Sequence, residues 1–427
     1  MGSTSVPGLN NMESKQCWIP LPQGTDFSIH NLPFGIFSVG NNPRRVGIAI
    51  GDKIVDMAVV AALGYFEPLE ISESVFMQGS LNRFIGLGKK LTNRVRLQVQ
   101  DWLCDPASPL KEHDYILVDQ DEASIHLPLQ IGDYTDFYSS LEHATNVGKM
   151  FRDPDNALLP NWKHLPVAYH GRSSSIVVSG VPVHRPSGQV MPKGATQPVF
   201  QASTRLDFEL EMAFVIGKEN RLGQPVPIRS AEDYIFGILL FNDWSARDIQ
   251  KWEYVPLGPF LGKNFASSVS PWVVTMEALE PFRVDGPVQE PEVLPYLQFE
   301  GPKNFDIHLE VSISTPDEIK STVCTSNFKH MYWNMAQQLA HHTVNGCNIR
   351  IGDLMASGTI SGQDPHSFGS MLELSWGGAK PIKLNHTSTR TFLEDYDTVT
   401  MRGWSRKQGV KVGFGEVQTK ILPTLDE

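Results

Sequence analysis

Three acidic residues alternate with apolar residues in the segment 205–216, Arg-Leu-Asp-Phe-Glu-Leu-Glu-Met-Ala-Phe-Val-Ile. The alternation predicts a β-strand, because successive side chains of a strand point to opposite faces, and it places Asp207, Glu209 and Glu211 on one face. Neighbouring carboxylates repel one another, and burying them unpaired is costly. The face is therefore either solvated, with Arg205 as a counter-charge, or it binds a divalent cation, since hard cations prefer carboxylate oxygens.

A second polar group follows the apolar run 235–241, which predicts a buried strand. Asp243 comes just after this run, where it either joins a site at the end of the strand or caps the following helix. Arg247 and Gln250 lie three positions apart on that helix and therefore project from one face. Together with Lys263 in a glycine-flanked loop, they indicate recognition of an oxyanion or a carboxylate.

The segment 133–143, Asp-Tyr-Thr-Asp-Phe-Tyr-Ser-Ser-Leu-Glu-His, predicts the beginning of a helix. Ser139 and Glu142 have the spacing of a capping box, so His143 falls in the first helical turn. The positive end of the helix dipole disfavours the imidazolium form there, and a neutral imidazole can serve as a general base. A structural histidine is the alternative interpretation.

Charge and composition exclude several classes of partner. The chain has 427 residues, with 36 Lys and Arg against 47 Asp and Glu, and a formal net charge of −11. An acidic chain without a basic tract is unsuited to nucleic acid and to anionic membrane surfaces, because both require clustered cations. We therefore expect neither partner. Apolar runs fall far short of the ~20 residues of a membrane span.

The cysteines and the N-terminal sequence predict the cellular location of the protein. Four cysteines are widely separated and form no CxxC pair: Cys17, Cys104, Cys324 and Cys347. This spacing disfavours a disulfide framework and a zinc ribbon. The N-terminal sequence shows neither the basic nor the apolar region of a secretory leader. We expect a cytoplasmic protein.

Common catalytic motifs are absent from the sequence. It contains no GxSxG elbow, Walker A loop, HExxH motif or GxGxxG after a strand. Serine hydrolase, nucleotide-binding and zincin chemistry are therefore disfavoured, and we expect no organic cofactor.

The elements that must position these residues are mostly strands. Residues 1–125 predict a small unit with strands at 36–39, 46–50 and 53–56 and one amphipathic helix over 80–103. Residues 126–427 predict a larger β-rich domain with strands at 174–179, 206–216, 235–241, 272–275, 307–313 and 412–417. Helical patterns there are few: after Ser139, after Asp243 and over 329–344. The 35 glycines and 30 prolines agree with many turns.

These separated pieces resemble the fumarylacetoacetase family, C–C bond hydrolases that end tyrosine and phenylalanine breakdown. The resemblance spans nearly the whole chain and keeps the order of the family motifs. The block 133–172 is its most specific part and contains DYTDFYSS, HATNVG, NALLPNW and YHGR. Further matches are FELE at 208–211, FNDWSARDIQ at 241–250, ASGTISG at 356–362 and GSMLELSW at 369–376. The sequence departs from the family pattern at Ala168, usually Gly, and at Ser267, usually Thr.

The resemblance implies roles for individual residues. It implies a Ca²⁺ site at Asp136, Glu209, Glu211 and Asp243, and an Mg²⁺ site bordered by Asp243, Lys263 and Ser267. His143 would be the base, oriented by Glu373, with Arg247, Gln250 and Lys263 stabilising the oxyanion. Substrate contacts are implied for Tyr138, Arg152, Tyr169, Gln250, Tyr254 and Thr359. The four carboxylates carry −4, and one divalent cation together with Arg247 and Lys263 would nearly neutralise them.

The implied fold is mainly β: a small N-terminal SH3-like barrel followed by a large C-terminal β-roll domain, in a homodimer. The implied reaction is hydrolysis of 4-fumarylacetoacetate, a β-diketone dicarboxylate, to fumarate and acetoacetate. Two alternatives remain open. One is a related acylpyruvate hydrolase, or a 2-oxo acid hydratase or decarboxylase, with the same acidic cluster. The other is a catalytically silent β protein that binds a small acid.

Overall fold

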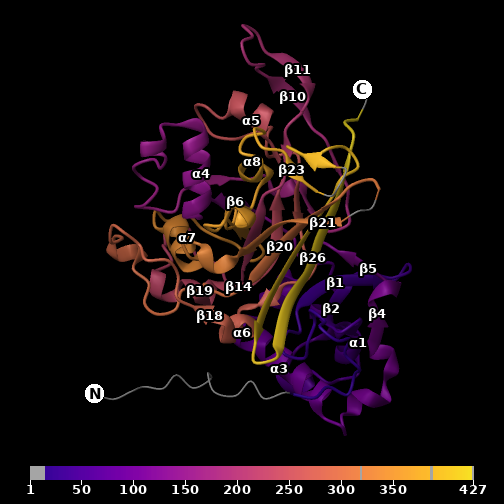
Figure 1. The fold of residues 1–427 in the computed structure, drawn as a ribbon. Coiled ribbons are helices and arrows are strands. Elements are labelled where there is room, and N and C mark those ends of the chain that lie inside the picture. The colour runs from indigo at the N-terminus through magenta and orange to yellow at the C-terminus, as the bar shows by residue number, and fades with distance from the viewer. Residues whose placement is uncertain (1–14, 318–319, 385–387, 426–427) are drawn as a thin grey trace.

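A computed structural model of the protein describes residues 15–317, 320–384 and 388–425 (Figure 1). The prediction that the N-terminal sequence lacks a leader pattern falls on residues 1–14, which lie outside the described residues. None of the helices in the described ranges is both long and apolar enough to cross a bilayer.

The N-terminal unit contains a five-stranded antiparallel sheet of order β4-β3-β2-β1-β5. Its strands are β1 Phe34–Val39, β2 Arg45–Ile50, β3 Lys53–Asp56, β4 Leu117–Asp119 and β5 Ala123–His126. The three strands predicted in this unit are all present. The helix α1, Met57–Ala62, follows β3 directly because Asp56 caps it, accepting hydrogen bonds from the backbone of Ala58 and Val59.

The prediction of a single helix over 80–103 is wrong. Two helices occupy this segment, α2 Asn82–Ile85 and α3 Lys89–Cys104. The break falls at Gly88, whose φ of +86° is outside the helical region and is available to glycine without steric cost. The apolar periodicity continues across the break, since Phe84, Val95 and Val99 all enter the same core.

An eight-stranded mixed sheet forms the centre of the C-terminal domain, with order β7-β6-β22-β13-β14-β16-β8 and β17 paired to β14. Its strands are β6 Tyr134–Phe137, β7 Ala168–His170, β8 Ile176–Val178, β13 Leu210–Ile216, β14 Ile235–Asp243, β16 Ser267–Val269, β17 Val274–Thr275 and β22 Leu354–Ala356. A five-stranded sheet, β21-β20-β25-β26-β9, packs against it. Its strands are β9 Val183–His184, β20 His308–Ser314, β21 Lys320–Asn327, β25 Thr398–Lys407 and β26 Val410–Leu422.

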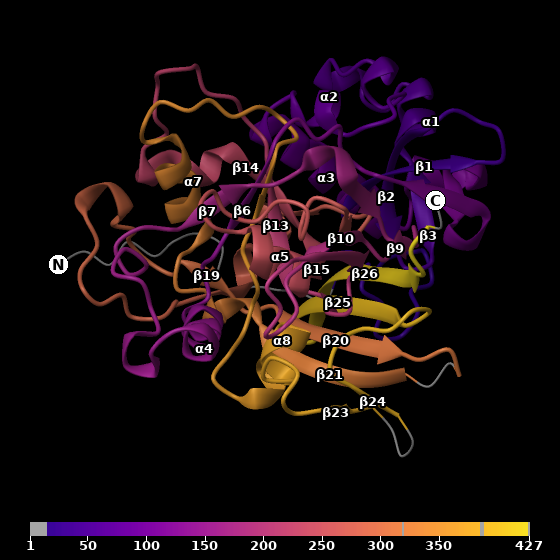
Figure 2. The ribbon, with the colours of Figure 1, turned by 90° about the horizontal axis from the view of Figure 1, so that it is seen from above.

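Both faces of the central sheet are buried. Met212 and Phe214 of β13 enter the core shared with the five-stranded sheet, whereas Ala213 and Val215 face the core of the N-terminal unit. The central sheet thus lies between the N-terminal unit and the long strands β25 and β26 (Figure 2). This explains why residues 235–241 of β14 are an unbroken apolar run, since a strand covered on both sides has no solvent-facing positions.

Short helices and paired strands surround this sheet. The helices are α4 Leu141–Phe151, α5 Arg247–Glu253, α6 Met276–Leu279, α7 Met335–Thr343 and α8 Met371–Leu374. The strand pairs are β10 Ser187–Val190 with β11 Val199–Ala202, β12 Leu206–Asp207 with β15 Ser245–Ala246, β18 Arg283–Val284 with β19 Asn304–Phe305, and β23 Ile382–Lys383 with β24 Thr389–Arg390. The β10–β11 hairpin projects from the body of the domain (Figure 1).

Two helix beginnings differ from the prediction. The cap of α4 is Ser140 rather than Ser139, and its hydroxyl accepts a hydrogen bond from the backbone of His143 at 3.2 Å. The helix expected from residue 329 begins at Met335, because Asn334 and Gln337 form a capping box there. The mainly β architecture, with a small N-terminal SH3-like barrel and a large β-roll domain, is confirmed.

Candidate active site

Four carboxylates meet at one end of the central sheet. Asp136 comes from β6, Glu211 from β13 and Asp243 from the last position of β14, while Glu209 directly precedes β13. One oxygen of each lies within 4.8 Å of the others, and all four residues are buried. The strand order explains the meeting: β6 is separated from β13 by β22 alone, and β14 is the next neighbour of β13.

The expected continuous strand over 206–216 is interrupted. It divides into β12 and β13, and Phe208 and Glu209 lie between them. Every residue from Leu206 to Ile216 is buried, so the alternative of a solvated acidic face is wrong. Asp207, which was predicted on the same face as Glu209 and Glu211, is not part of the four-carboxylate cluster. Its side chain points instead toward Arg247 and the beginning of α8.

Two buried cations partly balance the cluster. Lys263 forms ion pairs with Glu209 and with Asp243, the latter at 2.6 Å. Arg247 pairs with Glu209 at 2.7 Å and with Asp207 at 2.8 Å. Burial raises the pKa of Glu209, but Arg247 and Lys263 more than offset it, so the pKa of Glu209 lies well below its usual range. Glu209 is therefore ionised at neutral pH.

The other two carboxylates lack such partners. Asp136 Oδ1 and Glu211 Oε1 are buried and accept no hydrogen bond within the described residues. Burial, together with the neighbouring carboxylates, raises the pKa of both groups well above the usual range. Unpartnered carboxylate oxygens that converge on one point fit a hard divalent cation, which would neutralise them and complete their bonding.

The backbone at Gly358 completes the wall of this cluster. Its N–H donates a hydrogen bond of 2.9 Å to Glu211 Oε2. Gly358 has a φ of +78°, and a Cβ atom there would lie 2.3 Å from the carbonyl oxygen of Phe137. Glycine is required at this position for both reasons.

His143 and Glu373 form a buried pair beside the cluster. The Nδ1 atom of His143 lies 2.6 Å from Glu373 Oε2. The Glu373 carboxylate also accepts hydrogen bonds from side chains of Asn146 at 3.0 Å, and of Ser361 and Ser370 at 2.9 Å each. Burial raises the pKa of Glu373, but His143 and these donors outweigh it, so the pKa is lowered. An ionised carboxylate only accepts, so the proton of the pair resides on Nδ1 and the Nε2 lone pair is the basic site.

Other predicted residues border the same region. Gln250 Oε1 accepts a hydrogen bond from Arg247 at 3.3 Å. Tyr169 and Ser267 both donate to Asp243, at 2.8 and 3.1 Å. The interpretation of Asp243 as a helix cap is wrong, because Ala246 occupies the cap position of α5.

The predicted substrate residues are placed less uniformly. The ring of Tyr138 meets that of His143 edge to face, with centroids 5.2 Å apart. Thr359 is buried beside Gly358. Arg152 is exposed, and its guanidinium donates to the backbone carbonyl of Ala157. Tyr254 is also exposed, at the end of α5. Arg152 and Tyr254 therefore lie at the exposed edge of the candidate site rather than in its buried centre.

Several contributing residues escaped the sequence analysis. Ser370 is one of them, although it precedes the predicted Glu373 with the S-x-x-E spacing of a helix beginning, which could have identified α8. Asn146 lies one helical turn after His143, so periodicity could have placed both side chains on the same face of the helix. Ser361 and Gly358 carried no local signal, because their contacts to Glu373 and Glu211 are made entirely through tertiary structure.

Comparison with known proteins agrees with this geometry. Residues 133–422 match the family model described as Fumarylacetoacetate (FAA) hydrolase C-terminal, and residues 30–128 match Fumarylacetoacetase N-terminal. The chain is 54% identical over 414 residues to a fumarylacetoacetase of Homo sapiens, covering 96% of this chain and 99% of that relative. Fumarylacetoacetases of Caenorhabditis elegans and Arabidopsis thaliana are 52% and 48% identical, each over 95% of this chain, and 99% and 98% of their own lengths.

Solved structures share the fold at lower identity. A fumarylacetoacetate hydrolase from Exiguobacterium antarcticum aligns with a TM-score of 0.53 at 17% identity, covering 92% of this chain and 99% of that one. A maleylpyruvate hydrolase from Sphingobium aligns with a TM-score of 0.50 at 13% identity, covering 92% and 100%. The two matched family models and the full-length relatives lead to one conclusion: this chain belongs to the fumarylacetoacetase family.

Proposed function

We propose that the protein hydrolyses the C–C bond of 4-fumarylacetoacetate to fumarate and acetoacetate, the last step of tyrosine and phenylalanine breakdown. The observation that carries this proposal is the buried His143–Glu373 pair beside a four-carboxylate cluster, in a chain 54% identical along almost its full length to a fumarylacetoacetase. The enzyme is then a hydrolase acting on carbon–carbon bonds in ketonic substances.

His143 activates the water molecule in this proposal. Its Nε2 takes a proton from water as the water oxygen bonds to the carbonyl carbon that becomes the fumarate carboxylate. The Glu373 carboxylate holds the ring through Nδ1 and stabilises the imidazolium that forms. The bond to the neighbouring carbon then breaks, its electron pair leaves with the acetoacetate fragment as an enolate, and a proton converts the enolate to acetoacetate.

Fixed positive charge stabilises the oxyanion that forms when water adds. Arg247 and Lys263 are buried and held by carboxylates, so they need no reorganisation during the reaction. Gln250 lies beside Arg247 and supplies an amide donor. We assign substrate contacts to Tyr138, Arg152, Tyr169, Gln250, Tyr254 and Thr359.

We assign a Ca²⁺ ion to the cluster of Asp136, Glu209, Glu211 and Asp243, because an all-carboxylate donor set suits this cation. When bound, a divalent cation supplies Lewis acidity toward the oxygens of a β-diketone. We also propose an Mg²⁺ site beside Asp243, Lys263 and Ser267. Asp243 and Ser267 offer oxygen ligands there, whereas the Lys263 ammonium is a hydrogen-bond donor only and cannot itself ligate a cation.

An ultraviolet assay of purified protein tests the reaction. Metal-replete protein should remove the absorbance of fumarylacetoacetate and release fumarate and acetoacetate in equal amounts, and a chelator should suppress turnover. Cleavage of a simple acylpyruvate with no effect on fumarylacetoacetate would favour the related hydrolases. Binding of both compounds without turnover would indicate a catalytically silent binding protein.

We further propose a homodimer, supported by apolar side chains exposed on two neighbouring segments. The β10–β11 hairpin exposes Phe200 by 72%, and the loop after α5 exposes Leu257 by 96%. The hairpin contacts α5, which precedes this loop, since Trp252 of α5 donates a hydrogen bond to Gln189 of β10. Light scattering coupled to gel filtration should show twice the chain mass, and Phe200→Ser with Leu257→Ser should shift it toward the monomer.

The four cysteines are free thiols, which supports our proposal of a reducing, cytoplasmic location. We also propose residues 1–125 and 126–427 as the two folding domains.

A further inference from the structure

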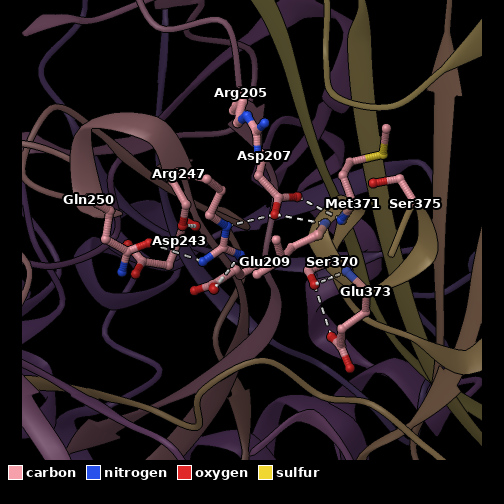
Figure 3. A network of polar contacts seen from close by, with 12 residues as sticks. Arg205, Asp207, Glu209, Asp243, Arg247, Gln250, Ser370, Met371, Glu373 and Ser375 are labelled. Atoms are coloured by element: carbon pink, nitrogen blue, oxygen red, sulfur yellow. Dashed lines mark hydrogen bonds and ion pairs between the residues drawn. The ribbon is translucent and has the colours of Figure 1, made fainter. Parts of the chain in front are cut away.

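Asp207 joins two elements of the site that are otherwise separate. It belongs to β12, its side chain is fully buried, and its carboxylate accepts three hydrogen bonds (Figure 3). The donors are Arg247 Nε at 2.8 Å and the backbone N–H groups of Met371 at 2.6 Å and Leu372 at 3.0 Å. We propose that Asp207 is a positioning residue that sets the place of the His143–Glu373 pair relative to Arg247.

The contact to α8 determines where Glu373 stands. Met371 and Leu372 are the first two residues of α8, and Glu373 follows them directly. Since both N–H groups bind the same carboxylate, Asp207 fixes this short helix in position and direction. Glu373 then reaches His143 at 2.6 Å. A displacement of α8 is therefore transmitted to the imidazole.

The contact to α5 determines where Arg247 stands. Asp207 pairs with Ser245 in the β12–β15 register, two residues before Arg247. Its side chain then receives Arg247 Nε, which aims the far nitrogen of the guanidinium at Glu209, 2.7 Å away. One carboxylate therefore orients the proposed oxyanion group and, through α8, the proposed base.

Replacing the Asp207 carboxylate by an amide would bring two hydrogen-bond donors face to face. All three partners of Asp207 are N–H donors, and Asp207 Oδ2 accepts two of them while Oδ1 accepts the third. An asparagine has one acceptor oxygen, so in either orientation its NH₂ group faces an N–H group at a buried position. Asp207→Asn should therefore shift α8 or Arg247 with little change in side-chain volume.

A matched control exists elsewhere in the chain. Asp397 is also fully buried, pairs with Arg390 and accepts a backbone N–H from Glu394. The arginines are comparably buried, with side-chain exposures of 9% for Arg247 and 10% for Arg390. Neither Arg390 nor Glu394 belongs to the candidate site. Asp397→Asn thus reproduces the loss of a buried Asp–Arg pair without touching α5 or α8.

The kinetic test rests on the proposed function. Asp207→Asn should lower kcat on fumarylacetoacetate by about 10- to 100-fold, the scale of a misplaced catalytic group, with KM changed less than about threefold. Asp397→Asn should keep the wild-type kcat at a temperature where both variants are folded. Each variant is then combined with Glu373→Gln. The losses in kcat should be non-additive when Asp207→Asn is combined with it, and additive when Asp397→Asn is combined with it. If Asp207→Asn fails to fold, Asp207→Glu retains the charge but displaces the carboxylate, and it should also lower kcat.

A second readout does not depend on activity. The imidazole ¹⁵N signals of His143, assigned by their loss in His143→Ala, should shift in Asp207→Asn and stay in place in Asp397→Asn. Unchanged signals and an unchanged kcat in folded Asp207→Asn would overturn the inference. Additive losses of kcat in both double variants with Glu373→Gln would overturn it as well. If wild-type protein leaves fumarylacetoacetate intact, the proposed function fails, while the His143 signals still decide whether Asp207 positions the ring.

Discussion

The imidazole of His143 and the carboxylate of Glu373 lie 2.6 Å apart although 230 positions separate them in the sequence. His143 stands in the first turn of α4 and Glu373 in α8, so the pair joins two short helices at the end of the central sheet. Glu373 is saturated by hydrogen-bond donors, which holds it ionised and holds the ring in one orientation.

This pairing predicts that His143 and Glu373 act on one step. His143→Ala should reduce kcat by about 10²–10⁴-fold, the usual contribution of a general base. Glu373→Gln should act on the same step, so the double variant should be little worse than His143→Ala alone. Saturating kinetics of the three variants provide the measurement. Multiplicative losses, or a defect confined to KM, would assign His143 to binding or structure.

The acidic cluster predicts loss of metal with loss of charge. Glu211→Gln removes a buried carboxylate whose Oε1 accepts no hydrogen bond within the described residues, so the site should bind Ca²⁺ and Mn²⁺ at least tenfold more weakly, about 1.4 kcal/mol or more. Calorimetric titration measures this directly. Glu416→Gln is the control, because Glu416 is surface-exposed and pairs with Arg402. Full metal affinity in Glu211→Gln would exclude this cluster as the metal site.

The raised pKa values of Asp136 and Glu211 predict how the metal-free protein responds to pH. Unfolded carboxyl groups titrate near pH 4, so between pH 5 and 8 the folded, metal-free protein binds more protons than the unfolded chain. Its free energy of unfolding should therefore fall as pH rises, by up to about 1.4 kcal/mol per pH unit for each proton. Glu209 and Glu373 have lowered pKa values and titrate below this window.

Thermal melts of chelated and Ca²⁺-loaded protein measure this effect. The gap between the two melting temperatures should widen from pH 5 to pH 8, because Ca²⁺ neutralises the carboxylates that otherwise repel. Comparing the two forms cancels other groups, such as His342, whose pKa is lowered to about 4 by burial. Chelated Glu211→Gln should be more stable than chelated wild type at pH 7.5. A gap independent of pH would contradict the prediction.

Gly358 is expected to be intolerant of a side chain. Gly358→Ala adds a Cβ atom 2.3 Å from the Phe137 carbonyl oxygen at a φ of +78°. The backbone must move, and its N–H then no longer reaches Glu211. We expect a loss of more than about 2 kcal/mol in stability together with weaker metal binding. Gly180→Ala is the control: its φ of +93° is equally strained, but no atom lies within 4 Å of the added Cβ. Similar costs in both variants would show that strain alone, and not the contact to Glu211, matters at Gly358.

Local sequence was sufficient to determine the nature of the elements and of the chemistry. Strand alternation and apolar runs identified β1 to β3, β13 and β14, because side-chain periodicity is a property of neighbouring residues. The acidic character of 207–211, the position of Asp243 after a buried strand and the early turn containing His143 were visible for the same reason. The order of the family motifs then indicated which of these residues form one site.

Only the tertiary structure decided how these residues are partnered. The choice between a solvated acidic face and a buried one depended on the N-terminal unit and the β25–β26 sheet, which cover the central sheet on opposite sides. The separate role of Asp207 depended on α8, whose sequence lies more than 160 residues away. Likewise, the break at Gly88 and the shift of the α4 cap to Ser140 arise from backbone conformation and packing at single residues. Sequence patterns depend on residues that are close along the chain. Burial and charge pairing depend on residues that are close in space, and these come together only when the sheets pack.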